Sequence, residues 1–214
     1  MTAGNTTRDL ILGRIREAVG VPRAAQAEAY AGIERSYDRS PSITREACLE
    51  LFVDRLAHYQ VTVRRTSRDE IPAAIAGAMS DRGKTRLVCP IDIDSSWLQN
   101  RIAVVADRAL SYHELDTSEG VLTGCSLGIA ATGTIVLRHG PGEGRRALTL
   151  IPDYHLCVVS SDQIVETVPE AMQWLAATGP ALVTTISGPS ATADIEMTRV
   201  RGVHGPRTLD VILV

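Results

Sequence analysis

The chain has 214 residues, a length typical of one α/β domain with a short appendage rather than of several domains. Its composition, 44% hydrophobic and 22% charged, is that of a globular protein and excludes a disordered or disulfide-stapled chain. The net charge of −3 argues against a large basic surface of the kind that binds nucleic acid.

The N-terminal segment is expected to form a helix followed by a linker. The apolar side chains whose spacing predicts the helix are Leu10, Ile11, Ile15 and Val19. Gly20 and Pro22 end this helix, and residues 23–41 lack a sustained period, which indicates a mobile linker. We therefore divide the chain into an N-terminal helix and linker over residues 1–42 and one α/β domain over residues 43–214.

Targeting signals are not evident in the sequence. The N-terminus interleaves apolar side chains with Arg, Asp and Glu, so it lacks the continuous apolar region of a signal peptide. Two long uncharged stretches, 120–137 and 171–193, are interrupted by Gly, Thr, Ser or Pro, which indicates buried strands and turns rather than membrane spans. We therefore expect a cytoplasmic protein.

The first half of the domain alternates between helical and extended patterns. Helices are expected over residues 43–59 and 69–79, and strands over residues 61–65, 86–90 and 102–106. This alternation is typical of βα units, so we expect an α/β fold with a mostly parallel sheet that helices cover on both faces.

The second half is richer in strands. Strands are expected over residues 134–137, 147–151, 154–159, 181–187 and 209–214, the first two joined as a hairpin by a glycine-rich loop. A capping box formed by Thr167 and Glu170 opens a helix that continues through Ala177. A further helical stretch is expected over residues 193–200.

Three short motifs resemble catalytic or phosphate-binding patterns but lack the context that those patterns require. Gly124-Cys-Ser-Leu-Gly128 matches the nucleophile elbow of hydrolases, yet too few residues follow it to form the long helix of a true elbow. Lys84 follows a glycine as in a P-loop, but the earlier glycine is replaced by Ala78. In Gly140-Pro-Gly-Glu-Gly144 the proline removes an N–H donor. We therefore expect Ser126, in the first motif, to be structural.

The four cysteines argue against a metal or iron–sulfur site in this chain. They lie more than thirty residues apart and form no C-x-x-C pair, whereas iron–sulfur clusters and structural zinc require closely spaced thiolates. We expect buried reduced thiols, no bound metal and no cofactor.

Two segments rich in small and hydroxyl residues predict an anion-binding site. The first contains Ser187, Gly188, Ser190 and Thr192 between a strand and an expected helix start, where free N–H groups and hydroxyls stabilise a carboxylate or phosphate. The alternative is that these hydroxyls only cap the helix. The second is a turn that enters another strand and could face the first across a cleft at the strand ends: Thr132, Gly133 and Thr134.

Four residues are candidates for acid–base chemistry, without an assigned role. Asp153 and His155 are two apart and share one side of an extended chain, so the carboxylate could orient the imidazole. Asp194 follows the first hydroxyl-rich segment, where it could instead only complement a helix dipole. His204 lies in the loop Gly-Val-His-Gly-Pro, and a structural role is the alternative for each histidine.

Four motifs in this order resemble one known family. They are Thr132-Gly-Thr-Ile-Val-Leu137, Ile151-Pro-Asp-Tyr-His155, Ile186-Ser-Gly-Pro-Ser-Ala-Thr-Ala-Asp-Ile-Glu196 and Gly202-Val-His-Gly-Pro206. Together they resemble the lactate utilization protein C family, also called LutC/YkgG or LUD-domain proteins, over about residues 43–214. The resemblance implies a three-layer α/β/α fold similar to the NagB/RpiA and CoA-transferase superfamily. It also implies a role in oxidising L-lactate to pyruvate with two partner proteins, LutA- and LutB-like, at least one of which carries iron–sulfur clusters.

Two hypotheses of different classes remain open. As a cofactor-free accessory component, the protein binds a small carboxylate or phosphate or a partner surface and does no chemistry alone. As an enzyme of the isomerase and CoA-transferase-like superfamily, it acts on a phosphorylated or CoA-linked substrate. The chain has neither the Ser-Glu-Asn-Gly-like motif of CoA transferases nor the nucleotide-binding glycine motif of formyltetrahydrofolate cyclo-ligases, which favours the accessory role.

Overall fold

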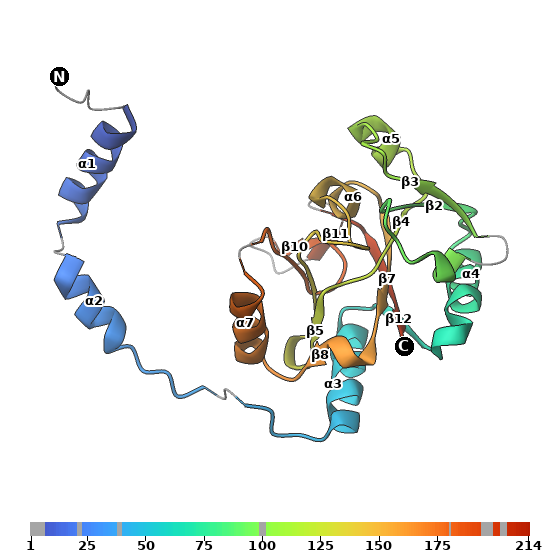
Figure 1. Ribbon diagram of the computed structural model, residues 1–214, viewed down its shortest axis with the longest axis horizontal. Helices are drawn as coiled ribbons and strands as arrows, with labels where there is room; N and C mark the ends of the chain where they lie inside the picture. The colour runs from blue at the N-terminus through green and yellow to red at the C-terminus, as the bar shows by residue number, and fades with distance from the viewer. Residues whose placement is uncertain are drawn as a thin grey trace. The chain divides into compact units, whose positions relative to one another are not determined.

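The protein divides into two compact units, Met1–Tyr37 and Asp38–Val214, in the computed structural model (Figure 1). The residues that the structure describes are 7–20, 23–37, 40–98, 102–179, 181–193, 199–201 and 205–214. The first unit contains α1 (Thr7–Val19) and α2 (Arg23–Ala31). Helix α2 lies in the segment expected to be a linker, because its many alanines favour a helix even without an apolar period.

A six-stranded parallel sheet forms the centre of the second unit. Its order is β1-β12-β7-β4-β2-β3, and every neighbouring pair runs parallel. The strands are β1 (Thr62–Arg65), β12 (Thr208–Leu213), β7 (Tyr154–Val159), β4 (Val121–Thr123), β2 (Arg86–Cys89) and β3 (Ala103–Ala106). The expected α/β class with a mostly parallel sheet is confirmed.

Helices cover both faces of this sheet, on either side of β7 and β12 (Figure 1). Side chains alternate along β7: Leu156 packs with α4 (Ile71–Asp81), and Cys157 packs with α3 (Arg45–His58). Because both faces are covered, all six residues of β7 are buried. Short helices complete the unit: η1 (Arg68–Glu70), η2 (Ser95–Leu98), α5 (Tyr112–Asp116), η3 (Ala130–Thr132), α6 (Arg146–Leu150) and η4 (Ser161–Gln163).

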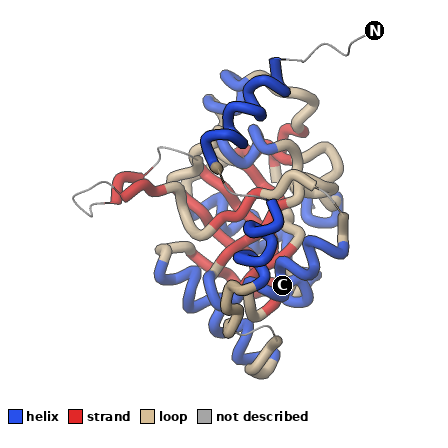
Figure 2. Tube along the Cα trace, turned by 90° about the vertical axis from the view of Figure 1, so that its left-hand side faces the viewer, coloured by secondary structure: helices blue, strands red, loops and turns tan. Residues whose placement is uncertain are grey.

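A second, four-stranded sheet packs beside α3, and its order is β8-β5-β6-β9. Its strands are β8 (Ile164–Val165), β5 (Leu127–Ile129), β6 (Thr134–Leu137) and β9 (Thr184–Ile186). Helix α7 (Val168–Ala177) covers the other face through Ala171. Figure 2 shows the strands of this unit in its interior and the helices around them.

Two expected elements are wrong. Residues 147–151 were expected to be a strand, but α6 forms there, because a helical turn brings Ala147, Leu148 and Ile151 onto one face against Val88 and Val121. The hairpin partner of β6 is therefore β5.

Residues 193–200 were expected to be helical, but β10 (Ala191–Ala193) and β11 (Arg199–Arg201) form an antiparallel hairpin. Thr192 pairs with Val200 in it, and these β-branched residues favour strands. Residues 194–198 lie outside the described part of the chain. Among the described residues, no helix is both long and apolar enough to cross a membrane.

The capping box of α7 is confirmed. Glu170 N donates to Thr167 Oγ1 over 3.3 Å, and Thr167 N donates to the Glu170 carboxylate over 2.8 Å. These two bonds satisfy N–H groups that the first turn of a helix leaves unpaired.

We expect Thr167→Ala to lower the free energy of unfolding by about 1 kcal/mol, because it removes the hydroxyl that accepts the Glu170 N–H. Urea denaturation of the full chain measures this change. Thr167→Ser keeps the hydroxyl and is the matched control, with a smaller loss expected. Equal losses in the two variants would contradict a capping role.

Candidate functional site

A cleft of about 280 Å³ lies where β9 ends and β7 begins. Four residues predicted from the sequence line it: His155, Ser187, Gly188 and Ser190. The end of the Gly-Val-His-Gly-Pro loop lines it as well, so three of the sequence motifs meet at one place. The cleft lies beside the amino ends of β7 and β12 of the main sheet. One of its walls is the turn that follows β9 of the second sheet.

His155, one of the residues that line this cleft, has a buried ring nitrogen without a hydrogen-bond partner among the described residues. Its side chain is buried in β7, with the residue 1% exposed. His155 Nε2 shares a hydrogen bond of 2.8 Å with Thr123 Oγ1, whereas Nδ1 has no partner among the described residues. A buried polar atom without a partner costs on the order of 1–3 kcal/mol, which makes this nitrogen a candidate for a hydrogen bond to a bound ligand.

Burial lowers the pKa of His155 to about 4, so the imidazole is neutral at physiological pH. A neutral imidazole carries one N–H and one acceptor nitrogen. His155 can therefore hydrogen-bond a ligand at Nδ1 without bringing a charge into the core.

The expected pairing of Asp153 with His155 does not form, because Asp153 has another partner. Arg207 Nε donates to Asp153 Oδ1 over 2.6 Å, and both side chains are more than half exposed. Asp153 precedes β7 and stays at the surface, while His155 points into the core. The carboxylate therefore does not orient the imidazole.

The turn after β9 is held by its backbone. Gly188 has a φ of 85°, and a Cβ at this position would collide with Tyr59 Cβ. Ser190 N donates to Pro206 O over 2.8 Å, which joins this turn to the Gly-Val-His-Gly-Pro loop. Only glycine fits the position of Gly188.

The second hydroxyl-rich turn contacts a residue of the cleft wall, Ser187. Thr132 Oγ1 and Thr134 Oγ1 are 2.7 Å apart, and Thr134 Oγ1 and Ser187 Oγ are 2.8 Å apart. Gly133 has a φ of 58° and packs against α3, where a Cβ would approach Arg55 Cβ to 2.7 Å. None of the three residues Thr132, Gly133 and Thr134 is among those that line the cleft, and only Thr134 contacts Ser187 directly.

Sequence reasoning missed Arg146, which supplies a positive charge at the cleft. Its NH1 donates to Thr184 Oγ1 over 2.6 Å, and Thr184 Oγ1 is 2.7 Å from His139 Nε2. His139 Nδ1 is 2.9 Å from Gly144 O, which can only accept, so in the neutral ring Nδ1 carries the proton and Nε2 accepts from Thr184. Arg146 was missed because a strand was expected over residues 147–151, and the helix α6 that begins at Arg146 was not.

Two predicted site residues, and the side chain of a third, are outside what the structure describes. Asp194 and His204 lie in the segments 194–198 and 202–204. The backbone of Thr192 is described as part of β10, but its side chain is not.

Ser126 holds a loop. Its hydroxyl donates to the carboxylate of Glu143, which is 3% exposed and also accepts from Arg138 N over 2.5 Å. Strand β5 follows Ser126 directly, where a nucleophile elbow would have a helix. These contacts agree with a structural role.

The described residues contain no group of three His, Cys, Asp or Glu side chains that could hold a metal ion. All four cysteines are free and buried. Burial raises the pKa of the Cys89 thiol to about 11, which keeps it protonated at neutral pH.

Comparison with known proteins identifies relatives over most of the chain. The family model described as LUD domain matches residues 49–214. Lactate utilization protein C of Deinococcus radiodurans is 47% identical over 176 residues, which cover 80% of this chain and 82% of that protein. Lactate utilization protein C of Halalkalibacterium halodurans is 29% identical over 213 residues, covering 91% and 89%. The crystal structure of a DUF162 family protein from Deinococcus radiodurans is similar, with a TM-score of 0.70 and 40% identity over 81% of this chain and 99% of that one.

We expect the free energy of unfolding to decrease as the pH falls, because His155 has a lower pKa in the folded protein than in the unfolded chain. Its pKa is about 4 in the folded state against 6.5 for the free side chain, so between these values the unfolded chain binds the extra proton. The contribution of neutral His155 to the free energy of unfolding is complete above pH 6.5. Roughly 3 kcal/mol of this contribution is lost as the pH falls to 4. Urea unfolding at a series of pH values measures this loss.

His155→Gln should flatten the profile, because the amide does not titrate. His58→Gln, at an exposed histidine, is the control and should follow the unmodified chain. Parallel profiles for His155→Gln and the unmodified chain would contradict the assignment.

Proposed function

The chain belongs to the LUD domain family, and we propose that it acts in lactate utilization as a protein of the lactate utilization protein C type. The observation that carries this proposal is the 47% identity to the Deinococcus radiodurans protein of that name over most of both chains. The four sequence motifs that resemble this family also support the proposal, and they lie between Thr132 and Pro206.

The chemistry of lactate oxidation supports an accessory role with a partner. Conversion of L-lactate to pyruvate removes an electron pair and two protons, and a redox cofactor must take the electrons. His, Asp and Arg side chains bind, orient and move protons but do not accept an electron pair. We therefore assign electron transfer to iron–sulfur partner proteins of the LutA and LutB type, as the family resemblance implies.

The cleft at His155 is the proposed binding site for a small carboxylate. Arg146 supplies the positive charge, the Nδ1 atom of His155 is available for a hydrogen bond, and the hydroxyls of Ser187 and Thr149 lie in the same wall. A volume of about 280 Å³ suits a ligand of a few heavy atoms, such as lactate or pyruvate. The alternative of a phosphorylated or CoA-linked substrate has less support, because Arg146 is the single cationic side chain among the described residues that line the cleft.

We expect Arg146→Gln to weaken carboxylate binding at least tenfold, because a charge-assisted hydrogen bond contributes about 1.5–3 kcal/mol. Calorimetric titration with L-lactate, pyruvate and inorganic phosphate measures the affinities. Arg108→Gln is the control, at an exposed arginine that does not line the cleft. Equal affinities in the two variants, or binding of phosphate alone, would overturn the proposed carboxylate site.

Deletion of the gene in its host should impair growth on L-lactate as sole carbon source and leave growth on pyruvate normal. The reason is that pyruvate is the product of lactate oxidation, so growth on pyruvate does not need the step in which the protein is proposed to act. The unmodified gene should restore growth, and the Arg146→Gln variant should restore it poorly. Normal growth of the deletion strain on lactate, without a second lactate dehydrogenase, would overturn the proposed function.

A further inference from the structure

A second cavity, of about 580 Å³, opens at the carboxyl ends of the main-sheet strands. The loops after β2, β4 and β7 form its walls, and none of its lining residues lines the His155 cleft. Strands β4 and β2 are neighbours in the sheet, but the chain leaves them in opposite directions. From β2 it passes to the edge strand β3, and from β4 it continues towards β7. Parallel sheets bind ligands at such a switch point, because the two loops diverge and leave a crevice.

Two carboxylates in this cavity are fixed by main-chain donors. Gly142 N donates to Asp92 Oδ1 over 3.0 Å, and Gly124 N donates to Gly142 O over 2.8 Å, which ties the loop after β6 to the rim. Ser96 N donates to Asp94 Oδ1 over 2.9 Å. Hydrogen bonds from Ser96 lower the pKa of Asp94, so this group is ionised at neutral pH. Both aspartates are exposed, so their carboxylate oxygens can accept further hydrogen bonds from a ligand.

The charge of the cavity disfavours anions. Among the described residues that line it, the acidic side chains are Asp92, Asp94 and Asp162, and the cation is Arg68. Arg68 is already paired, since its NH2 lies 3.2 Å from Asp162 Oδ2. A ligand that carries a carboxylate or phosphate would therefore meet net negative charge.

Trp97 adds an apolar wall. It belongs to η2, is partly buried and packs against Gly124, where a Cβ would lie 3.4 Å from its ring. An indole beside fixed carboxylates is suited to a ring compound: the ring packs on the indole, and its hydroxyls donate to the carboxylates.

We infer that this cavity binds an uncharged ring compound with vicinal hydroxyl groups, which donate to Asp92 and Asp94 while the ring packs on Trp97. A nucleoside and a pyranoside share this chemistry. The inference is independent of the proposed role in lactate utilization, because it concerns other residues, at the opposite ends of the sheet strands.

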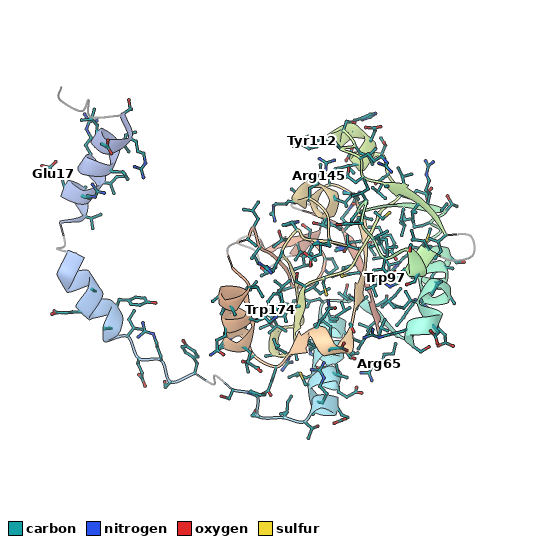
Figure 3. The ribbon with its side chains drawn as sticks, viewed as in Figure 1. Glu17, Arg65, Trp97, Tyr112, Arg145 and Trp174 are labelled. Carbon is teal, nitrogen blue, oxygen red and sulfur yellow. The ribbon has the colours of Figure 1, made fainter. Side chains whose placement is uncertain are left out.

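Tryptophan fluorescence provides the test. The chain has two tryptophans, and Figure 3 shows them apart, Trp97 beside α4 and Trp174 on α7. Trp174→Phe therefore leaves Trp97 as the reporter. Full-length protein is titrated with adenosine, 2′-deoxyadenosine, adenosine monophosphate and methyl β-glucoside, and calorimetry on the unmodified chain gives a second reading that does not depend on Trp174→Phe folding.

We expect saturable quenching by adenosine or by methyl β-glucoside, and whichever binds identifies the source of the hydroxyls. If adenosine binds, the 2′-deoxy compound and the monophosphate should each bind roughly tenfold more weakly, through the lost hydroxyl and the added charge. Asp92→Asn should weaken binding of either compound to a similar degree, since the amide oxygen still accepts from Gly142 N and leaves the loop in place.

Asp116→Asn, at an exposed aspartate of α5, is the matched control and should bind like the unmodified chain. Absence of saturable binding by both compounds would overturn the inference. Tighter binding of the monophosphate than of adenosine, or an unchanged affinity in Asp92→Asn, would also overturn it. None of these results bears on growth on lactate, so the two proposals fail separately.

Discussion

The burial of β7 on both faces is the constraint on which the rest of the structure depends. The strand pairs in parallel with β4 on one side and with β12 on the other, and all six of its residues are buried. Such a strand must be apolar wherever it meets α3 or α4, so each polar atom in it needs a specific partner. The hydroxyl of Tyr154 donates to Asp210, which Arg82 holds through two hydrogen bonds. The imidazole of His155 is satisfied on one side only.

The two ends of this strand lead to two chemically different sites. At its amino end, neutral His155 faces a cleft that also contains Arg146. At its carboxyl end, Val158 and Ser160 line a cavity whose carboxylates exceed its cations. Among the described lining residues, the charge is therefore positive at the first site and negative at the second.

Buried ion pairs and carboxylates fix the loops between these sites. Asp107 accepts from Arg145 at both oxygens, and this ion pair holds the amino end of α6, where Arg146 follows. The Arg145 guanidinium lowers the pKa of Asp107, so the pair persists through neutral pH. Glu143 in turn binds Ser126 and the backbone of Arg138. Removal of one partner from such a pair leaves a buried charge, which is more costly than the loss of a surface contact.

The sequence by itself determined the features that depend on neighbours along the chain. The capping box at Thr167, the alternation of helices and strands and the order of the family motifs are all local patterns, and they predict the α/β class and the family. They also placed His155 and Ser187 among the site residues. Only the tertiary structure decided what depends on partners distant in sequence. Arg207 pairs with Asp153 across 54 residues, Arg146 lines the cleft from α6, and His155 Nδ1 is buried without a partner among the described residues. Periodicity carries no information about such contacts, because they form only when the strands and loops meet in space.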